Sequence, residues 1–305
     1  LRRFVAHEVA HWWNMGVYRS DPQRPWLHEG HADWAALLAL HATGQIDAAG
    51  MRSELQSAFN TCLLARGRQA AALLPPGYGG GDNPYACGMG LMALAQAAVA
   101  ARQGAAAPSL AAPLALLAGL HQNAGPVLDG AGFAAWADGG PAGAMGRLLT
   151  DPALPFDASF RQQAAQAGLV HDHALDAPDA PVPASLRTAL AGRLMQQLMR
   201  ADCSGSFSFW TEADHLRLGD KLACHTLRMG GEATHVQGLP LLAQPGPAWA
   251  AVVQACAAGL PLRVAYRTGA DSHTPCTAPW PALPTSHFVT LQPQALQRLG
   301  LAAQH

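Results

Sequence analysis

The chain has little charge and no excess of either sign. Only 13% of its 305 residues are charged, and 19 Lys and Arg stand against 20 Asp and Glu, which gives a formal net charge of -1. Proteins that attract nucleic acid or anionic membranes over long range usually carry a basic excess. We therefore expect no nucleic-acid partner, and selectivity for a substrate must come from local contacts.

Long apolar runs are also lacking. The longest run, near Leu110 to Leu120, is interrupted by Pro113 and is shorter than the roughly 20 residues that cross a bilayer. We expect no membrane span in this chain. Because the chain starts at Leu1 and not at a methionine, and a motif begins as early as His7, we expect it to begin inside a longer protein. The sequence therefore predicts neither its compartment nor its oligomeric state.

The cysteines show no metal-binding spacing such as CxxC. The six cysteines are Cys62, Cys87, Cys203, Cys224, Cys256 and Cys276. We expect buried free thiols, and one or two disulfides in an exported protein stay open as the alternative. No GxSxG motif is present, so a serine nucleophile of the α/β-hydrolase type has no support.

Half of the residues are apolar, which is enough for a sizeable core and, at this length, for two or three domains. Apolar residues recur at helical spacing over the first hundred positions. This spacing predicts helices near 2–15, 27–43, 46–66 and 85–102. The segment 103–170 is rich in alanine and leucine and is broken by prolines, which predicts several short helices packed as a bundle.

Residues 172–184 are rich in proline and aspartate, as linkers often are. They divide a predicted domain at 1–171 from a second at 185–305. The second domain has helical patterns near 185–201 and 248–259. Runs typical of strands cover 206–210, 221–227, 233–237, 262–267 and 287–291. This part is therefore predicted to be a small β-containing (α+β) domain.

One motif carries recognisable metal chemistry. His7, Glu8 and His11 form an HExxH sequence in a helix-compatible stretch. Residues four apart lie one turn apart on the same helix face, so both imidazoles can bind one ion. Neutral imidazole suits zinc, and a catalytic zinc site has three protein ligands and one open position. The motif predicts one zinc ion per chain and needs a third ligand from elsewhere.

The segment WLHEGHADW offers that third ligand. Its candidates are Glu29, His28 and His31, on a second helix that begins near Leu27. Asp33 follows Glu29 by one helical turn, where its carboxylate can accept a hydrogen bond from a ligand histidine and fix the tautomer. A solvent-facing aspartate in the first turn of a helix is the alternative.

The remaining parts of a hydrolytic site follow from the chemistry. Zinc lowers the pKa of its bound water toward about 7, and Glu8 is the candidate general base. The oxyanion that forms on a carbonyl substrate needs a hydrogen-bond donor besides the metal. A tyrosine hydroxyl would serve, and the chain has four tyrosines, Tyr18, Tyr78, Tyr85 and Tyr266.

The sequence HEVAHWWN followed by WLHEG resembles the HExxHxW and WLNEG elements of the aminopeptidase N and leukotriene hydrolase group, and of the related glycyl aminopeptidase family. The resemblance implies a gluzincin zinc metallopeptidase with a thermolysin-like helical part. In such a protein His7, His11 and Glu29 hold the zinc and Glu8 is the general base. The gap from His11 to Glu29 contains 17 residues, one fewer than the usual pattern of the group.

Two later elements extend the resemblance. NPYACGMG is similar to the Y-x-x-G element of these families, which assigns the oxyanion donor to Tyr85, with Tyr78 as the fallback. Ala86 and Cys87 replace the charged residues of that element. The glycyl aminopeptidase layout ends in a PDZ domain, and LRLGDKL at 216–222, followed by VQGLPL, is faintly similar to one.

The residues and the resemblance together predict a mainly α catalytic region followed by a small β-containing, PDZ-like domain. The predicted function is hydrolysis of peptide or small-protein substrates, as an aminopeptidase. The segment that recognises the substrate N-terminus in that group would precede Leu1, so the aminopeptidase assignment depends on the resemblance alone. The alternatives are a non-peptidase zinc hydrolase and a catalytically impaired zinc-containing scaffold.

Overall fold

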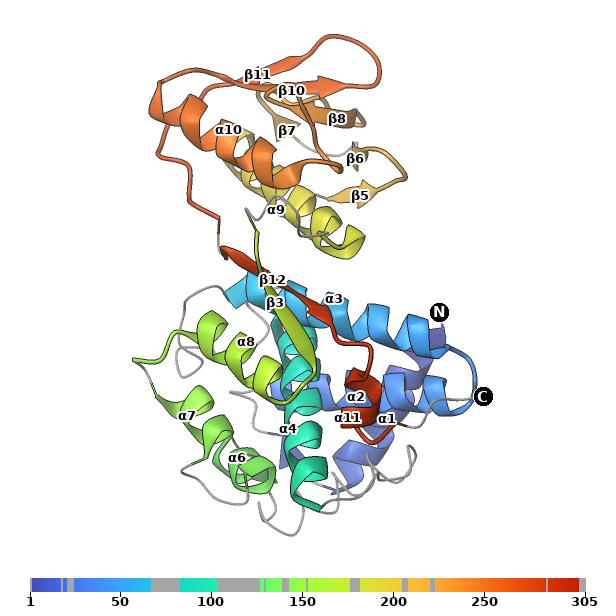
Figure 1. Cartoon of the computed structure of the whole chain (residues 1–305). Coiled ribbons are helices and arrows are strands. Elements are labelled where there is room, and N and C mark those ends of the chain that lie inside the picture. The colour runs from blue at the N-terminus through green and yellow to red at the C-terminus, as the bar shows by residue number, and fades with distance from the viewer. Residues whose placement is uncertain are drawn as a thin grey trace. The chain divides into compact units, whose positions relative to one another are not determined.

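A mainly helical N-terminal region is followed by a C-terminal region with small antiparallel sheets (Figure 1). The computed structural model describes residues 2–17, 19–20, 25–66, 83–103, 127–128, 130–138, 143–151, 153–175, 182–204, 208–219, 223–283 and 285–301. The chain divides into two compact units, the first formed by Leu1–Ala174 with His287–His305 and the second by Leu175–Ser286. Each unit is described by itself below.

Helices make up most of the first unit. They are α1 (Arg2–Val17), α2 (Pro25–Ala42), α3 (Ala48–Arg66), the π-helix η2 (Asn83–Cys87), α4 (Gly88–Gln103), α6 (Gly130–Asp138), α7 (Ala144–Thr150), α8 (Phe156–Gln166) and α11 (Ala295–Arg298). The short strands β1 (Arg19–Ser20) and β2 (Val127–Leu128) pair in parallel. All four helices predicted before residue 103 are present, and short helices follow in the described part of 103–170.

The core of this unit forms around α2. Leu27, Trp34 and Leu38 on this helix are fully buried. The indole of Trp34 donates a hydrogen bond to Gln96 Oε1 on α4 (2.8 Å), and the Gln96 amide donates to the carbonyl of Leu299 (2.6 Å). Buried polar groups are normally paired in this way. The relay ties α2, α4 and the segment after α11 into one core.

The helix α4, with the turn before it, is unusually apolar. The segment Pro84–Arg102 is long and apolar enough to cross a membrane by length and composition alone, yet 72% of its most apolar window is buried inside the fold. The core helix of a globular protein meets the same criterion. The residues that make it apolar include Leu91 and Met92, which are fully buried here. The absence of a membrane span, inferred from the shorter run near Leu110, stays a prediction.

The strand β12 (His287–Leu291) belongs to the first unit. It pairs antiparallel with β3 (Val170–Ala174), in register from Leu291 opposite Val170 to His287 opposite Ala174. This differs from the predicted division, in which residues 172–184 were a linker and 185–305 a separate domain. The sequence of β3 is VHDHA, and only Val170 is buried. A segment this polar resembles a linker in composition, which is why the sequence did not indicate a strand here.

Asn60 on α3 forms hydrogen bonds with the backbone of β12. Its Oδ1 accepts a hydrogen bond from the Val289 N–H, and its Nδ2 donates to the Val289 carbonyl, both at 2.9 Å and both buried. Asn60→Ala would leave two buried backbone groups without these partners, at about 1 to 3 kcal/mol each. We expect the free energy of unfolding, measured with urea, to fall by about 2 to 6 kcal/mol.

A matched control for Asn60→Ala is Gln56→Ala. Gln56 accepts only one hydrogen bond from this strand, from the Leu291 N–H at 2.9 Å, and it is partly exposed. Water can replace a partly exposed partner, so the loss should be smaller. Equal losses for the two variants would contradict the role given to Asn60.

All six cysteines form disulfides, so the prediction of free thiols was wrong. The pairs are Cys62–Cys87, Cys203–Cys224 and Cys256–Cys276. The first pair joins α3 to η2, and the second joins β4 (Cys203–Ser204) to β7 (Ala223–Cys224). Each bridge links segments that meet only after folding, which spacing along the chain does not reveal.

The second unit combines helices with one main sheet. Its further elements are α9 (Ala184–Asp202), β5 (Phe209–Thr211), β6 (Leu216–Leu218), β8 (Glu232–Val236), β9 (Leu239–Pro240), α10 (Pro245–Ala257), β10 (Leu262–Tyr266) and β11 (Ser272–Thr274). The sheet has the order β11-β10-β8-β6-β5, antiparallel throughout, with β9 beside β8. The two helices and the strands β8 and β10 agree with the predicted ranges to within three residues. Of the runs predicted at 206–210 and 221–227, the strands β5 and β7 each occupy only part. The strands β6 and β11 were not predicted, because three residues are too few to show alternation.

Candidate metal centre

Two helices bring the three predicted ligands together. Nε2 of His7 lies 2.9 Å from Nε2 of His11, and Glu29 Oε2 lies 3.2 and 3.3 Å from these two nitrogens. Neighbouring ligand atoms of a tetrahedral zinc ion, with bonds of about 2.0 to 2.2 Å, are about 3.3 Å apart. The three donor atoms are therefore spaced as one face of such a tetrahedron. Their residue types, two imidazoles and a carboxylate, also fit zinc.

The structure distinguishes between the candidates for a third ligand. Among the described residues, Glu29 is the one that joins His7 and His11 in a cluster of ligand atoms within 4.8 Å of one another. The ring of His28 stacks on His11, with centroids 4.4 Å apart. His31 is buried, and burial lowers its pKa to about 3, so it is neutral. His28 and His31 are thus not part of the candidate group of three donor atoms.

Asp33 makes the contact that its spacing predicted. His7 Nδ1 donates a hydrogen bond to Asp33 Oδ1 at 2.9 Å, which leaves Nε2 facing His11 and Glu29. Arg3 contacts the other oxygen of Asp33 at 3.3 Å and also pairs with Glu54. A carboxylate on the far nitrogen fixes the tautomer of a ligand histidine and raises its basicity. Arg3 holds that carboxylate in place, a role that the sequence did not suggest.

The same contacts change the protonation of His7 in the metal-free chain. The hydrogen bond with Asp33, followed by that with Glu29, raises the pKa of His7 from 6.5 to about 9, although burial opposes the shift. A histidine whose pKa is raised by folding stabilises the fold fully below its unfolded pKa, and this stability is lost as the pH rises through the folded pKa. We expect the chelator-treated chain to lose stability between pH 6.5 and 9.

Urea unfolding at pH 6.5 and pH 9 checks this expectation. Asp33→Asn replaces the charged acceptor of the hydrogen bond that raises this pKa most with a neutral one, so the difference between the two pH values should shrink in that variant. A parent chain whose unfolding free energy stays constant across this range would contradict the network around His7.

Two glycines allow the motifs to meet. A Cβ placed on Gly30, next to Glu29, would lie 2.2 Å from Gly88 Cα, and one on Gly88 would lie 2.2 Å from the Trp26 carbonyl oxygen. Any side chain at either position would force α2 away from the start of α4. The glycine of WLHEG and the glycine of YACG therefore form one backbone contact, which brings Tyr85 close to the ligands.

Tyr85 lies beside the cluster, in η2. Its ring centroid is 5.8 Å from that of His7, and 38% of the residue is exposed. Burial raises the pKa of Tyr85, and the charges of Glu29, Asp33 and Glu8 raise it further. The hydroxyl therefore keeps its proton at neutral pH and can donate it in a hydrogen bond. The buried Cys62–Cys87 disulfide holds the segment two residues further on.

The other three tyrosines do not belong to the described part of the first unit. Tyr266 is buried in the sheet of the second unit, where its hydroxyl contacts Ser272 Oγ at 3.1 Å. Tyr18 and Tyr78 lie outside the described residues. Tyr85 is thus the described tyrosine that the fold places at the cluster.

Glu8 is exposed on α1, next to His7. It takes no part in the ligand cluster, and its charge acts on Tyr85. A general base must reach a substrate or a water molecule, and an exposed carboxylate next to His7 in the sequence can do so. Trp12, one turn further along α1, is 77% exposed on the same helix.

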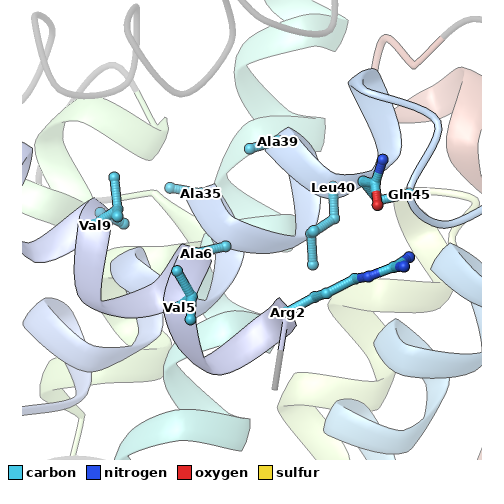
Figure 2. Close-up of a pocket in the computed structure, with 9 residues that line it drawn as sticks. Arg2, Val5, Ala6, Val9, Ala35, Ala39, Leu40 and Gln45 are labelled. Carbon is cyan, nitrogen blue, oxygen red and sulfur yellow. The ribbon is translucent and has the colours of Figure 1, made fainter.

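An apolar groove lies on the same two helices. It measures about 450 Å³ and is lined mainly by small and aliphatic side chains of α1 and α2, among them Val5, Val9, Ala35 and Leu40 (Figure 2). None of its lining residues is a candidate ligand or Glu8. The residues that line the groove and the residues assigned to the chemistry are therefore two separate sets on these helices.

A second group of close donor atoms is already accounted for. Asp202, Cys203 and Cys224 lie within 4.8 Å of one another, but the two cysteines form a disulfide. The Asp202 carboxylate accepts hydrogen bonds from the backbone N–H groups of Thr226 and Leu227. These contacts make the group a structural one.

Comparison with known proteins adds no relative, because no protein-family model and no curated protein matches the chain.

Proposed function

We propose that the chain is a zinc-dependent metallopeptidase of the gluzincin type. The observation that carries the proposal is the convergence of His7 Nε2, His11 Nε2 and Glu29 Oε2 at separations of 2.9 to 3.3 Å. Three buried or half-buried donor atoms at these distances match the face of a tetrahedral zinc site. His7, His11 and Glu29 would hold one zinc ion per chain.

The zinc ion would supply two effects when bound, a lower pKa for coordinated water and polarisation of the substrate carbonyl. The protein side chains act around it. Glu8 accepts a proton from the attacking water and passes it to the leaving amine. The Tyr85 hydroxyl donates a hydrogen bond to the oxygen that becomes negative in the transition state. Asp33 keeps His7 in the required tautomer.

The proposed substrate is a peptide or small protein, cut near its N-terminus. This part of the proposal depends on the resemblance of HEVAHWWN, WLHEG and NPYACG to the aminopeptidase N and glycyl aminopeptidase families. The same resemblance suggests a thermolysin-like helical part around α1 and α2 and a PDZ-like second unit. Three disulfides fit folding in an oxidising compartment.

A second candidate is a zinc-containing scaffold with impaired catalysis. The feature that favours it is the pair Ala86 and Cys87, which replaces the charged residues of the family element, with Cys87 held in a disulfide. In this reading the zinc cluster is retained for stability and the second unit recruits a partner. A non-peptidase zinc hydrolase would use the same ligands on another electrophile.

Cleavage assays on the zinc-loaded chain separate these functions. We expect peptides with a free N-terminus to be cut faster than their N-acetylated forms, with activity lost on chelation and restored by zinc. Faster hydrolysis of an epoxide or ester than of any peptide would favour the non-peptidase hydrolase. Bound zinc without any turnover would favour the scaffold.

A further inference from the structure

A second cluster of charged side chains surrounds His215 in the second unit. His215 precedes β6 and is 2% exposed. The turn that carries it is closed by a hydrogen bond from the Glu212 N–H to the His215 carbonyl at 3.0 Å. On the neighbouring strand, Glu232 begins β8 and stands opposite Arg217 of β6. The turn and the start of β8 thus bring one histidine and several carboxylates together.

The orientation of the His215 ring is set by Asp214. Nδ1 donates to Asp214 Oδ1 at 2.9 Å, and the same carboxylate pairs with Arg267. The hydrogen bond from His215 and, next, the one from Arg267 lower the pKa of Asp214, which keeps it ionised. An ionised acceptor on Nδ1 places the histidine proton there. In the neutral ring, Nε2 then carries no proton and presents a lone pair.

That lone pair points into a negative environment. Nε2 of His215 is shielded from solvent and makes no hydrogen bond, while Glu212 Oε2 lies 3.2 Å away and Glu232 Oε2 lies 3.8 Å away. A buried polar atom without a partner calls for an explanation, and an ion is one of the few available. At these separations the Nε2 lone pair repels both carboxylate oxygens unless a cation or a proton lies between them.

The charge balance favours a divalent cation. Glu212, Asp214 and Glu232 carry three negative charges, and Arg267, which lies 3.6 Å from Glu232, supplies one positive charge. With neutral His215, two of these negative charges have no positive partner among the contacts of the cluster. A proton on His215 would cancel only one of them, whereas a divalent ion cancels both.

We propose that Glu212, His215 and Glu232 bind a divalent transition-metal cation, with zinc as the representative ion. One imidazole with two carboxylates is a donor set that suits zinc and related metals. Asp214 supports the ligand histidine in the way a carboxylate supports ligand histidines in general. This site belongs to the second unit and is independent of the function proposed for the first.

The glutamates must adjust to close the site. Among the described residues, the close donor clusters do not include this one, so the two carboxylates must turn toward a shared ion. Their side chains are 46% and 34% exposed, which leaves them room to move around the fixed imidazole. A bound ion would join the turn at 212–215 to β8 and stabilise the sheet of the second unit.

Zinc titration of the 305-residue chain carrying His11→Ala tests the site, because that substitution removes a candidate ligand of the first cluster. We expect one equivalent of zinc to bind by calorimetry and to raise the melting temperature. Adding Glu212→Gln or Glu232→Gln should weaken this binding by about 10-fold or more. Both glutamates are partly exposed, so these variants should fold even where a change at buried His215 would not.

His225→Gln is the matched control, since His225 is an exposed histidine of the same unit, and it should leave the titration unchanged. Either of two outcomes would overturn the proposal. One is the absence of zinc binding in the His11→Ala chain. The other is zinc binding that is equally strong in the Glu212→Gln and Glu232→Gln variants, which would place the ion elsewhere on the surface.

Discussion

Replacing Glu8 by glutamine should leave zinc bound and lower kcat for peptide cleavage by about 100- to 10,000-fold, the usual contribution of a general base. The amide has nearly the shape of the carboxylate but does not accept a proton at neutral pH. Glu8 is exposed and is not one of the clustered donor atoms, so neither the fold nor the metal should depend on its charge. The loss should therefore appear in kcat and not in zinc content.

Two control measurements test whether the loss of activity in Glu8→Gln comes from the missing base. Elemental analysis should show the same zinc content as the parent chain, and Glu8→Asp should keep part of the activity, because a shorter carboxylate is still a base. A Glu8→Gln chain with full activity would contradict the general-base role. A Glu8→Gln chain that has lost its zinc would show that Glu8 acts on the metal cluster.

Tyr85→Phe should lower kcat by about 100- to 1,000-fold with little change in KM, as expected when one donor to a developing oxyanion is removed. The ring of Tyr85 lies 5.8 Å from that of His7. Burial and the charges of three nearby carboxylates raise the pKa of Tyr85, so its hydroxyl stays protonated. Phenylalanine preserves the ring and its contact with His7. The experiment thus removes the hydroxyl alone.

Tyr266→Phe makes the same chemical change in the second unit. The Tyr266 hydroxyl contacts Ser272 and accepts a hydrogen bond from the Arg228 N–H, so its loss should lower the melting temperature and leave kcat unchanged. An unaltered kcat in Tyr85→Phe would contradict the role of Tyr85 as the oxyanion donor. If the parent chain itself has a negligible rate that Tyr85→Phe does not alter, the scaffold is the better account.

The local parts of the candidate site could be predicted because they follow helix geometry. The four-residue spacing of His7 and His11, and of Glu29 and Asp33, places each pair on one helix face. Short-range spacing therefore sufficed to anticipate the contact between Asp33 and a ligand histidine, which the structure has at 2.9 Å. The choice of Glu29 over His28 came from the resemblance, and the geometry of the cluster agrees with it.

The contacts between distant segments could not be predicted in this way. The pairing of β3 with β12 joins positions more than a hundred residues apart, and one buried residue in β3 is too little to mark a strand. The three disulfides likewise depend on which elements meet in the fold. Each of the two motifs contains a glycine, so the sequence indicated that Gly30 and Gly88 could matter. That these two glycines contact each other is apparent only from the structure.

The central claim is that His7, His11 and Glu29 hold a zinc ion. The most direct test is elemental analysis of the purified chain and of its His11→Ala variant after both are loaded with zinc and dialysed. The account predicts that the variant holds one zinc ion fewer per chain than the parent. Equal zinc content in the two proteins would contradict it, because the cluster would then contribute no metal site.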